Sequence, residues 1–131
     1  MTKIKQVIVI RRDLNMRRGK EIAQGSHASM EFLIDPLRTG LRADGVAVPL
    51  TLTTQEAAWI VHGAAKICLQ VASEADLVSC HQAALAKGLK SYLIRDSGRT
   101  EFHGEPTLTA CAIGPDEAAR IDEVTGGLTL Y

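Results

Sequence analysis

The run Val7-Ile8-Val9-Ile10 constrains the fold of this 131-residue chain more than any other feature of its sequence. Four consecutive β-branched residues favour an extended backbone, and a run without polar alternation is typical of a strand that is buried on both faces. We therefore expect residues 6–10 to form a central strand with helices packed on either side of its sheet. The length of the chain and its hydrophobic content of 46% suffice for one compact domain with such a core.

Helices and further apolar strands alternate along the rest of the chain. Strands are expected at residues 66–71, 92–94 and 107–113, and helices at residues 18–34, from Thr53 to Gly63, at residues 73–87 and from a start at Gly114-Pro115-Asp116-Glu117. This order predicts an α/β fold. We expect a three-layer α/β/α single domain over residues 1–131, with a small mixed β-sheet of about four strands flanked by helices.

Residues 36–52 interrupt this alternation. The Asp35-Pro36 pair is expected to end the first helix, because the residue before a proline disfavours helical geometry. Residues 36–52 contain two prolines, Pro36 included, and two glycines. They predict a long irregular connection, in which residues 46–52 form a short extended piece. We interpret residues 36–52 as a mobile flap or insertion at the surface of the domain.

Composition and residue spacing argue against membrane, disulfide and metal-binding proteins. No apolar run approaches the roughly 20 residues that cross a bilayer, and the stretch at residues 7–10 is too short for a signal peptide. We therefore expect a cytoplasmic protein without membrane contact. Cys68, Cys80 and Cys111 are far apart and odd in number, which favours buried thiols over a disulfide framework. The histidines show no ligand spacing to one another or to a cysteine, so we expect no metal site.

The formal charge is balanced over the chain but not along it. Residues 1–20 contain seven Lys or Arg residues and one Asp, whereas residues 21–131 contain eight basic and fourteen acidic residues. A basic end on a neutral protein can attract a polyanion, and it can equally serve only solubility. Charge alone leaves these two interpretations open.

The first predicted helix carries a polar stripe. Its members fall within about 60° of one another at 100° per residue, and they are Lys20, Gln24, His27 and Glu31. On periodicity alone, a solvated helix face is the commoner explanation for such a stripe. The residues at the start of the helix favour a binding site instead, because the cations Arg11, Arg17 and Arg18 and free backbone N–H groups lie beside the stripe. Together they predict a site for an anion.

Three groups of residues resemble the second, archaeal/eukaryotic-type family of peptidyl-tRNA hydrolases. The first group runs from Val7 through Gly19-Lys20, Ala23-Gln24 and His27-Ala28, and the second comprises Trp59, Gly63 and Lys66-Ile67. The third comprises Gly88-Leu89, residues 93–100, Thr107, Ile113-Gly114-Pro115, Asp122 and Thr125-Gly126. Their joint order and spacing carry the resemblance, which covers the chain except residues 36–52. The connection from His27 to Trp59 is longer than the family leads us to expect.

The resemblance implies a function and a set of functional residues. It implies hydrolysis of the ester that joins a peptide to the 3′ end of tRNA, with tRNA as the partner and with no cofactor. The residues expected to be catalytic are Lys20, His27, Asp96 and Thr100. The residues expected to bind the substrate are Gln24, Arg99 and Thr107 from the resemblance, and Arg11, Arg17 and Arg18 from the predicted anion site.

Ester hydrolysis needs an activated water and donors for the oxyanion that forms. Asp96 follows the predicted strand at residues 92–94, at the end where α/β sheets place ligand groups. It could orient or deprotonate water while Lys20 stabilises the anion, and His27 could share proton transfer, so the general base stays open. Two other functions stay open as well. One is an RNA-binding module of the same fold that acts on another tRNA-linked substrate or without catalysis, and the other is an oligomerising structural domain. A homodimer is one alternative for the oligomeric state.

Overall fold

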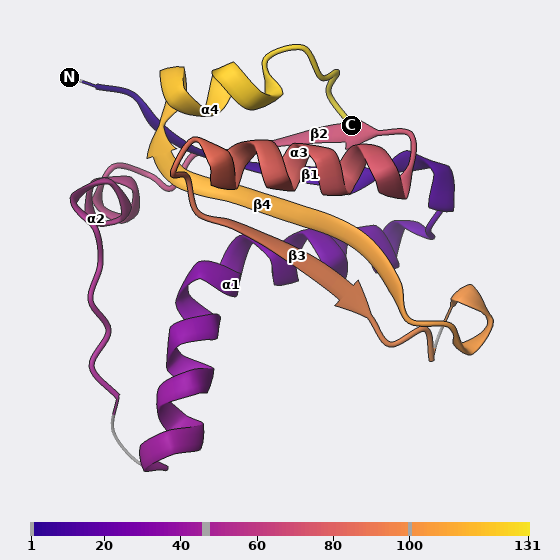
Figure 1. Ribbon diagram of the computed structural model, residues 1–131, viewed down its shortest axis with the longest axis horizontal. Helices are drawn as coiled ribbons and strands as arrows, with labels where there is room; N and C mark the ends of the chain where they lie inside the picture. Colours follow the sequence, from indigo (N-terminus) through magenta and orange to yellow (C-terminus); the bar gives the residue numbers. More distant parts are fainter. Residues whose placement is uncertain (1, 46–47, 100) are drawn as a thin grey trace.

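The computed structural model describes residues 2–45, 48–99 and 101–131, which form one α/β domain (Figure 1). The strands of these residues are β1 (Ile4–Arg11), β2 (Lys66–Val71), β3 (Ser91–Asp96) and β4 (Thr107–Glu117). The helices are α1 (Arg18–Asp44), α2 (Thr54–Val61), α3 (Glu74–Ala86) and α4 (Ala118–Thr125), with short 3-10 turns η1 (Arg12–Leu14) and η2 (Phe102–Gly104).

The sheet has the strand order β2-β1-β4-β3 and is mixed, as predicted. β1 pairs in parallel with β2 and antiparallel with β4, which in turn pairs antiparallel with β3. Residues 7–10 of β1 are at most 8% exposed, because strands flank them on both sides and helices cover both faces. The expected central strand is therefore confirmed.

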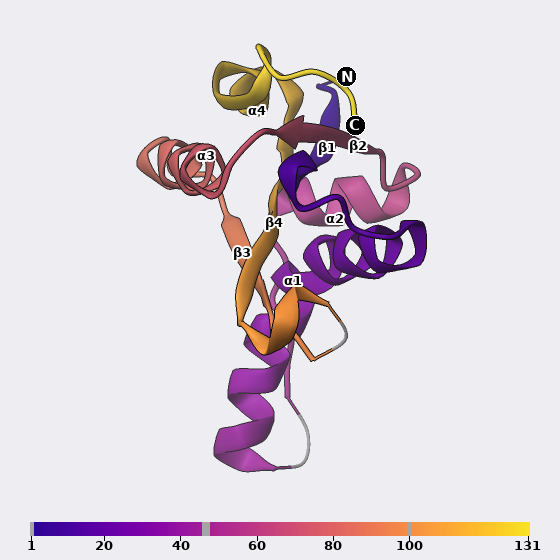
Figure 2. The same ribbon diagram turned by 90° about the vertical axis from the view of Figure 1, so that its right-hand side faces the viewer.

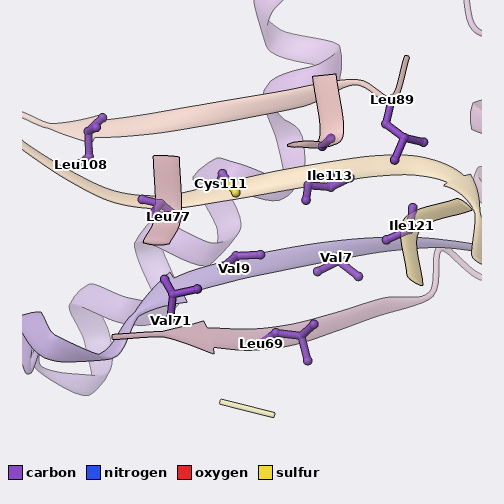
Figure 3. Close-up of a cluster of buried hydrophobic side chains, with 11 residues drawn as sticks. Val7, Val9, Leu69, Val71, Leu77, Leu89, Leu108, Cys111, Ile113 and Ile121 are labelled. Carbon is purple, nitrogen blue, oxygen red and sulfur yellow. The ribbon is translucent and has the colours of Figure 1, made fainter. Parts of the chain in front are cut away.

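Two hydrophobic cores lie on opposite faces of the sheet. Val7 and Val9 of β1 point toward α3 and α4, where Figure 3 shows them in one cluster with Leu77 and Ile121. Ile8 and Ile10 of β1 point the other way and pack with Ala28 of α1. Figure 2 shows α1 and α2 on one side of the sheet and α3 on the other. The three-layer α/β/α prediction is confirmed.

The N-terminal caps that the sequence predicts for two of the helices are confirmed. The hydroxyl of Thr53 accepts a hydrogen bond from Glu56 N, and the Glu56 carboxylate accepts one from Thr53 N, so a complete capping box begins α2. Ser73 caps α3 by accepting from Asp76 N at 3.1 Å. These caps satisfy backbone N–H groups that no helical carbonyl reaches.

The prediction that the first helix ends at Asp35-Pro36 is wrong. α1 continues to Asp44 and ends at Gly45, whose φ of 76° is the left-handed geometry that glycine adopts freely. Pro36 lies on an exposed side of the helix, and an ion pair of 2.8 Å between Arg38 and Glu31 connects the turns on either side of it. The helix thus continues despite the local preference against helix before a proline, with this side-chain pair holding the turns on either side together.

The rest of the predicted irregular connection is shorter than expected. Residues 46–47 lie outside the described residues, and residues 48–52 form no strand. Val48 packs so closely against Gly40 of α1 that a Cβ atom at Gly40 would clash with it. The first part of the predicted insertion, residues 36–44, is therefore helical. In Figure 1 the last turns of α1 extend away from the sheet.

The predicted helix start at Gly114-Pro115 is also wrong, because residues 114–117 continue β4 and α4 begins at Ala118. Glu117 and Asp116 pair with Ile4 and Lys5, beside a register shift in β1. Irregularities of this kind are where a strand accommodates proline. Gly114 has a φ of 89°, and a Cβ atom there would lie 3.0 Å from Lys5 O, so the position requires glycine.

Candidate active site

Asp96, at the end of β3, is the centre of a hydrogen-bonded cluster with α1. Lys20 Nζ lies 2.8 Å from Asp96 Oδ1 and donates to it, and Gln24 Nε2 donates to the same oxygen at 3.3 Å. The backbone N–H of Gly98 donates to the other oxygen, Oδ2, at 2.8 Å. Residues 76 and 72 positions apart in the sequence therefore meet where β3 ends beside the start of α1.

Charge and burial define the state of this carboxylate. The side chains of Lys20 and Asp96 are only 15% and 11% exposed, so their interaction is poorly screened by water. The hydrogen bond from Lys20 is the largest cause that lowers the pKa of Asp96, followed by the N–H of Gly98, and burial opposes them. Asp96 is therefore ionised at neutral pH.

A buried threonine is hydrogen-bonded to Gln24 of this cluster, and sequence analysis did not identify it. Thr109 of β4 is fully buried, and its hydroxyl donates a short hydrogen bond to Gln24 Oε1. This bond turns the amide nitrogen of Gln24 toward Asp96. The signal in the sequence was a lone hydroxyl within the apolar run of residues 108–113. Thr107, which the resemblance did indicate, lies opposite Asp96 in the strand pairing, and its hydroxyl donates to Glu105 O at 2.8 Å.

A polar cavity of about 420 Å³ adjoins the cluster at Gly98. Arg17 and Arg99 line it together with Asn15, Glu101 and the η2 turn. The Arg17 side chain is 86% exposed, and its nearest carboxylate, Glu101, is 3.7 Å away. This cavity combines cations with access from solvent, as a site for an anion requires. Thr100 lies outside the described residues.

His27 does not share in the hydrogen bonds around Asp96. Its side chain is 50% exposed, and its Nε2 lies 3.2 Å from Glu31 Oε2, one turn further along α1. That distance allows an ion pair, but the geometry gives Glu31 Oε2 no hydrogen bond. Arg38 binds the other oxygen of Glu31 at 2.8 Å. The polar stripe predicted on this helix thus divides into two clusters.

The arginines near the start of α1 differ in whether their side chains are bound within the protein or exposed to solvent. Arg11 is engaged within the protein, because its guanidinium donates to both carboxylate oxygens of Asp13 and to Leu108 O. These bonds also hold the pKa of Asp13 below its usual value. Arg18, like Arg17, has an exposed side chain. The exposed pair is better placed than Arg11 to contact a large anion.

A second groove, of about 510 Å³, lies on the other side of α1 between the helix and β1. Apolar residues such as Ile8, Ile22 and Met30 dominate its lining. It lacks the paired carboxylate and ammonium of the Asp96 cluster, so we place the candidate active site at Asp96. In the described parts of the chain, no three His, Cys, Asp or Glu residues are grouped to hold a metal ion. No helix in those parts has the length and apolar character of a membrane span.

Comparisons with known proteins cover almost the whole chain. The family model described as "Peptidyl-tRNA hydrolase PTH2" matches residues 4–131. A peptidyl-tRNA hydrolase of Methanocaldococcus jannaschii is 41% identical over 128 residues, which are 97% of this chain and 99% of that protein. One of Aeropyrum pernix is 41% identical over 97% of this chain and 95% of that protein. One of Haloquadratum walsbyi is 39% identical over 98% of this chain and all of that protein.

Proposed function

The chain belongs to the peptidyl-tRNA hydrolase PTH2 family and hydrolyses the ester bond of peptidyl-tRNA, and on that premise we propose that Asp96 and Lys20 carry the reaction. The observation that supports this assignment is the buried contact of 2.8 Å between Lys20 Nζ and Asp96 Oδ1 beside an arginine-lined cavity. The products are free tRNA and a peptide or an N-acylated amino acid.

Asp96 holds and polarises the attacking water. Each oxygen of an ionised carboxylate can accept two hydrogen bonds. Oδ1 accepts from Lys20 and Gln24, and Oδ2 accepts from Gly98 N; in this proposal the attacking water donates to Oδ2 as well. A carboxylate whose pKa is lowered is a weak base, so the main effect of Asp96 is to orient the water and to stabilise the positive charge that develops on it.

Lys20 stabilises the negative charge that appears when water attacks the ester carbonyl. An ammonium group in a site shielded from solvent interacts strongly with such an oxyanion. The hydroxyls of Thr100 and Thr107 are proposed as neutral donors to the same group, and His27 as a participant in proton transfer to the leaving 3′ oxygen. The positive charge needed for the transition state comes from the protein, so the proposed reaction uses neither a metal nor a cofactor.

The exposed arginines bind the tRNA phosphates in this proposal. Arg17, Arg18 and Arg99 lie at the start of α1 and around the cavity next to Gly98. Phosphate contacts of this kind give sequence-independent affinity, as an enzyme that accepts many tRNAs needs. Arg11 then acts indirectly, because its bonds to Asp13 fix the turn that leads into α1.

Three further assignments complete the proposal. The protein acts in the cytoplasm as a single peptidyl-tRNA hydrolase domain over residues 1–131. A homodimer is the alternative to a monomer, and sedimentation in solution distinguishes them. Residues 36–52 serve as a flap beside the substrate, now with the end of α1 as their first part.

The activity is tested by incubating the pure protein with N-acetyl-aminoacyl-tRNA and following release of the N-acetyl amino acid. We expect release by the wild-type protein in the presence of EDTA, and loss of release in the Asp96→Asn variant. A protein that binds the tRNA without releasing the amino acid would show that this chain is a binding module. Activity that EDTA abolishes and a transition metal restores would overturn the assignment to Lys20 and Asp96.

A further inference from the structure

The sheet has one covered edge and one open edge. At the covered edge, residues 129–131 run beside β2, where Gln70 N donates to Thr129 O and Tyr131 N donates to Cys68 O, both at 3.0 Å. At the other edge, β3 has β4 as its only strand neighbour in the described residues. Figures 1 and 2 show β3 at the margin of the sheet, with helices over its faces and no strand beyond it.

The backbone groups that point outward from β3 follow from one hydrogen bond. Gly114 N donates to Lys90 O at 2.9 Å, so the polar backbone groups of Lys90 face β4. Because these groups alternate along a regular antiparallel pair, those of Ser91 and Leu93 face away from β4, up to the register shift between Ile94 and Arg95. No backbone group in residues 2–45, 48–99 or 101–131 forms a hydrogen bond with them. β3 is about 17 Å long, and of the two residues with outward backbone groups Leu93 is partly exposed, whereas Ser91 is buried.

This edge leads directly into the candidate active site. β3 ends at Asp96, the carboxylate that contacts Lys20. Proteins usually protect exposed edge strands with a bulge, a proline or a covering segment. Here the edge strand carries the apolar run Tyr92-Leu93-Ile94 without a proline, and the register shift against β4 comes only after this run, between Ile94 and Arg95. The contrast with the covered edge of β2 indicates that the open edge is kept for a ligand.

We propose that the open edge of β3 binds the peptide of the substrate as an added parallel strand, and this inference rests on the proposed function. The peptide is joined to tRNA through its C-terminal carbonyl, which must reach Asp96. Since β3 runs from Ser91 toward Asp96, only a peptide parallel to β3 places its C-terminus at the carboxylate. Hydrogen bonds to the peptide main chain provide affinity that does not depend on side chains, which suits an enzyme whose substrates carry peptides of any sequence.

The cavity next to Gly98 is consistent with this direction. The peptide extends back from Asp96 along β3, whereas Arg17 and Arg99 line the cavity beyond the end of the strand. The two halves of the substrate therefore diverge from the carboxylate in opposite directions. The ester bond that joins them lies between, next to Lys20.

The first test is a scan of the substrate with the wild-type protein. N-acetyl-pentapeptidyl-tRNAs are prepared in which one backbone amide at a time is N-methylated. Every second amide faces β3 in an added strand, so we expect methylation to raise KM about five- to tenfold at alternate positions and little in between. kcat should stay within about twofold for amides remote from the ester. A KM that is equal at all positions, or that changes only next to the ester, would overturn the proposal.

The second test removes one outward donor from the protein. Leu93→Pro lacks the backbone N–H that faces away from β4, and edge strands tolerate proline at such positions. Leu93→Ala is the matched control, because it loses the same side chain but keeps the N–H. We expect the KM of the pentapeptidyl substrate, relative to that of N-acetyl-aminoacyl-tRNA, to be about fivefold higher in Leu93→Pro than in Leu93→Ala. Equal ratios in the two variants contradict the proposal, and the substrate scan decides the question if Leu93→Pro fails to fold.

Two controls separate the possible failures. If the wild-type protein cleaves neither the short nor the long substrate, the proposed function fails, whereas cleavage of both without alternation in the scan rejects only the role of the β3 edge. Sedimentation tests whether the edge instead binds a second copy of the chain. A wild-type dimer that Leu93→Pro dissociates, and Leu93→Ala does not, would assign the edge to self-association and overturn the proposal.

Discussion

Two carboxylates, one on α1 and one at the end of β3 beside it, are buried to nearly the same extent but are held in different ways. The side chains of Asp96 and Glu31 are 11% and 10% exposed. Both oxygens of Asp96 accept hydrogen bonds, from Lys20, Gln24 and Gly98 N. Glu31 has one oxygen bonded to Arg38, while the other lies next to the His27 ring and has no hydrogen bond within the described residues.

The comparison shows why one polar stripe on a helix makes two sites. Gln24 and Glu31 are seven residues apart, about 10 Å along the helix axis. β3 crosses beside α1 so that its terminal residue, Asp96, meets only Lys20 and Gln24. The second cluster receives its cation from α1 itself, one turn or more further on. Burial of a carboxylate is therefore not enough to identify the reacting group, and its donors and its neighbouring cavity distinguish Asp96.

The largest effect is expected when each carboxylate in turn becomes an amide. Asp96→Asn keeps the shape but loses the charge that orients water, so kcat should fall by about 10² or more. Glu31→Gln is the matched control at the second buried carboxylate, and its kcat should stay within about threefold of the wild type. Both are measured as single-turnover hydrolysis of N-acetyl-aminoacyl-tRNA. Full turnover by Asp96→Asn, or an equal loss in Glu31→Gln, would remove the distinction between the two carboxylates.

The second prediction concerns the acid limb of the pH–rate profile. The hydrogen bond from Lys20 is the main cause of the lowered pKa of Asp96, so wild-type activity is retained as the pH falls until it reaches that lowered pKa. In Lys20→Ala the pKa of Asp96 rises, and the acid limb should move to higher pH. kcat should also fall about tenfold or more, because the oxyanion loses its cation.

Lys87→Ala is the control for Lys20→Ala, since it removes a lysine that pairs with Glu123 far from the site. Its acid limb should coincide with that of the wild type. An acid limb that stays in place in Lys20→Ala would show that Asp96 does not titrate in the reaction.

The third prediction separates binding from chemistry. Arg17→Ala combined with Arg18→Ala should raise KM about tenfold at low salt and leave kcat largely intact, as expected when uniform binding is lost. The logarithmic salt slope of tRNA binding should become shallower by about 0.7 to 0.9 per lost phosphate contact. Lys87→Ala removes a cation that pairs with Glu123 far from the site, so it should change neither quantity. An unchanged salt slope in the double variant would reject the proposed phosphate contacts.

Much of this architecture could be predicted from the sequence, because its signals are local. The β-branched run of β1, the capping box of Thr53 and Glu56, and the limits of β2 follow from neighbouring residues. The two errors arise where other contacts outweigh a local rule for proline, an ion pair across the turns of α1 at Pro36 and pairing with β1 after Gly114-Pro115. No local pattern contains the register that brings two distant elements together.

The candidate site shows the same division. The resemblance indicated Lys20, Gln24 and Asp96, and the structure brings these three together. It could not indicate Thr109, because the role of that hydroxyl depends on β4 lying beneath α1. The stripe likewise could not show that the partner of His27 is Glu31 rather than Asp96. Helical spacing places His27 and Glu31 on the same face as Lys20 and Gln24, and it does not show which of them Asp96 of β3 approaches.

The smallest effect is expected at His27, and it tests the comparison most directly. The ring lies next to Glu31 and is half exposed, so any proton that it transfers must reach the ester through solvent or after a rearrangement. We therefore expect His27→Asn to lower kcat by less than about tenfold, well below the loss in Asp96→Asn. If His27 acts through its contact with Glu31, then His27→Asn combined with Glu31→Gln should be no slower than His27→Asn alone. A loss in His27→Asn as large as that in Asp96→Asn would place the histidine in direct contact with the reacting atoms and would join the two clusters into one site.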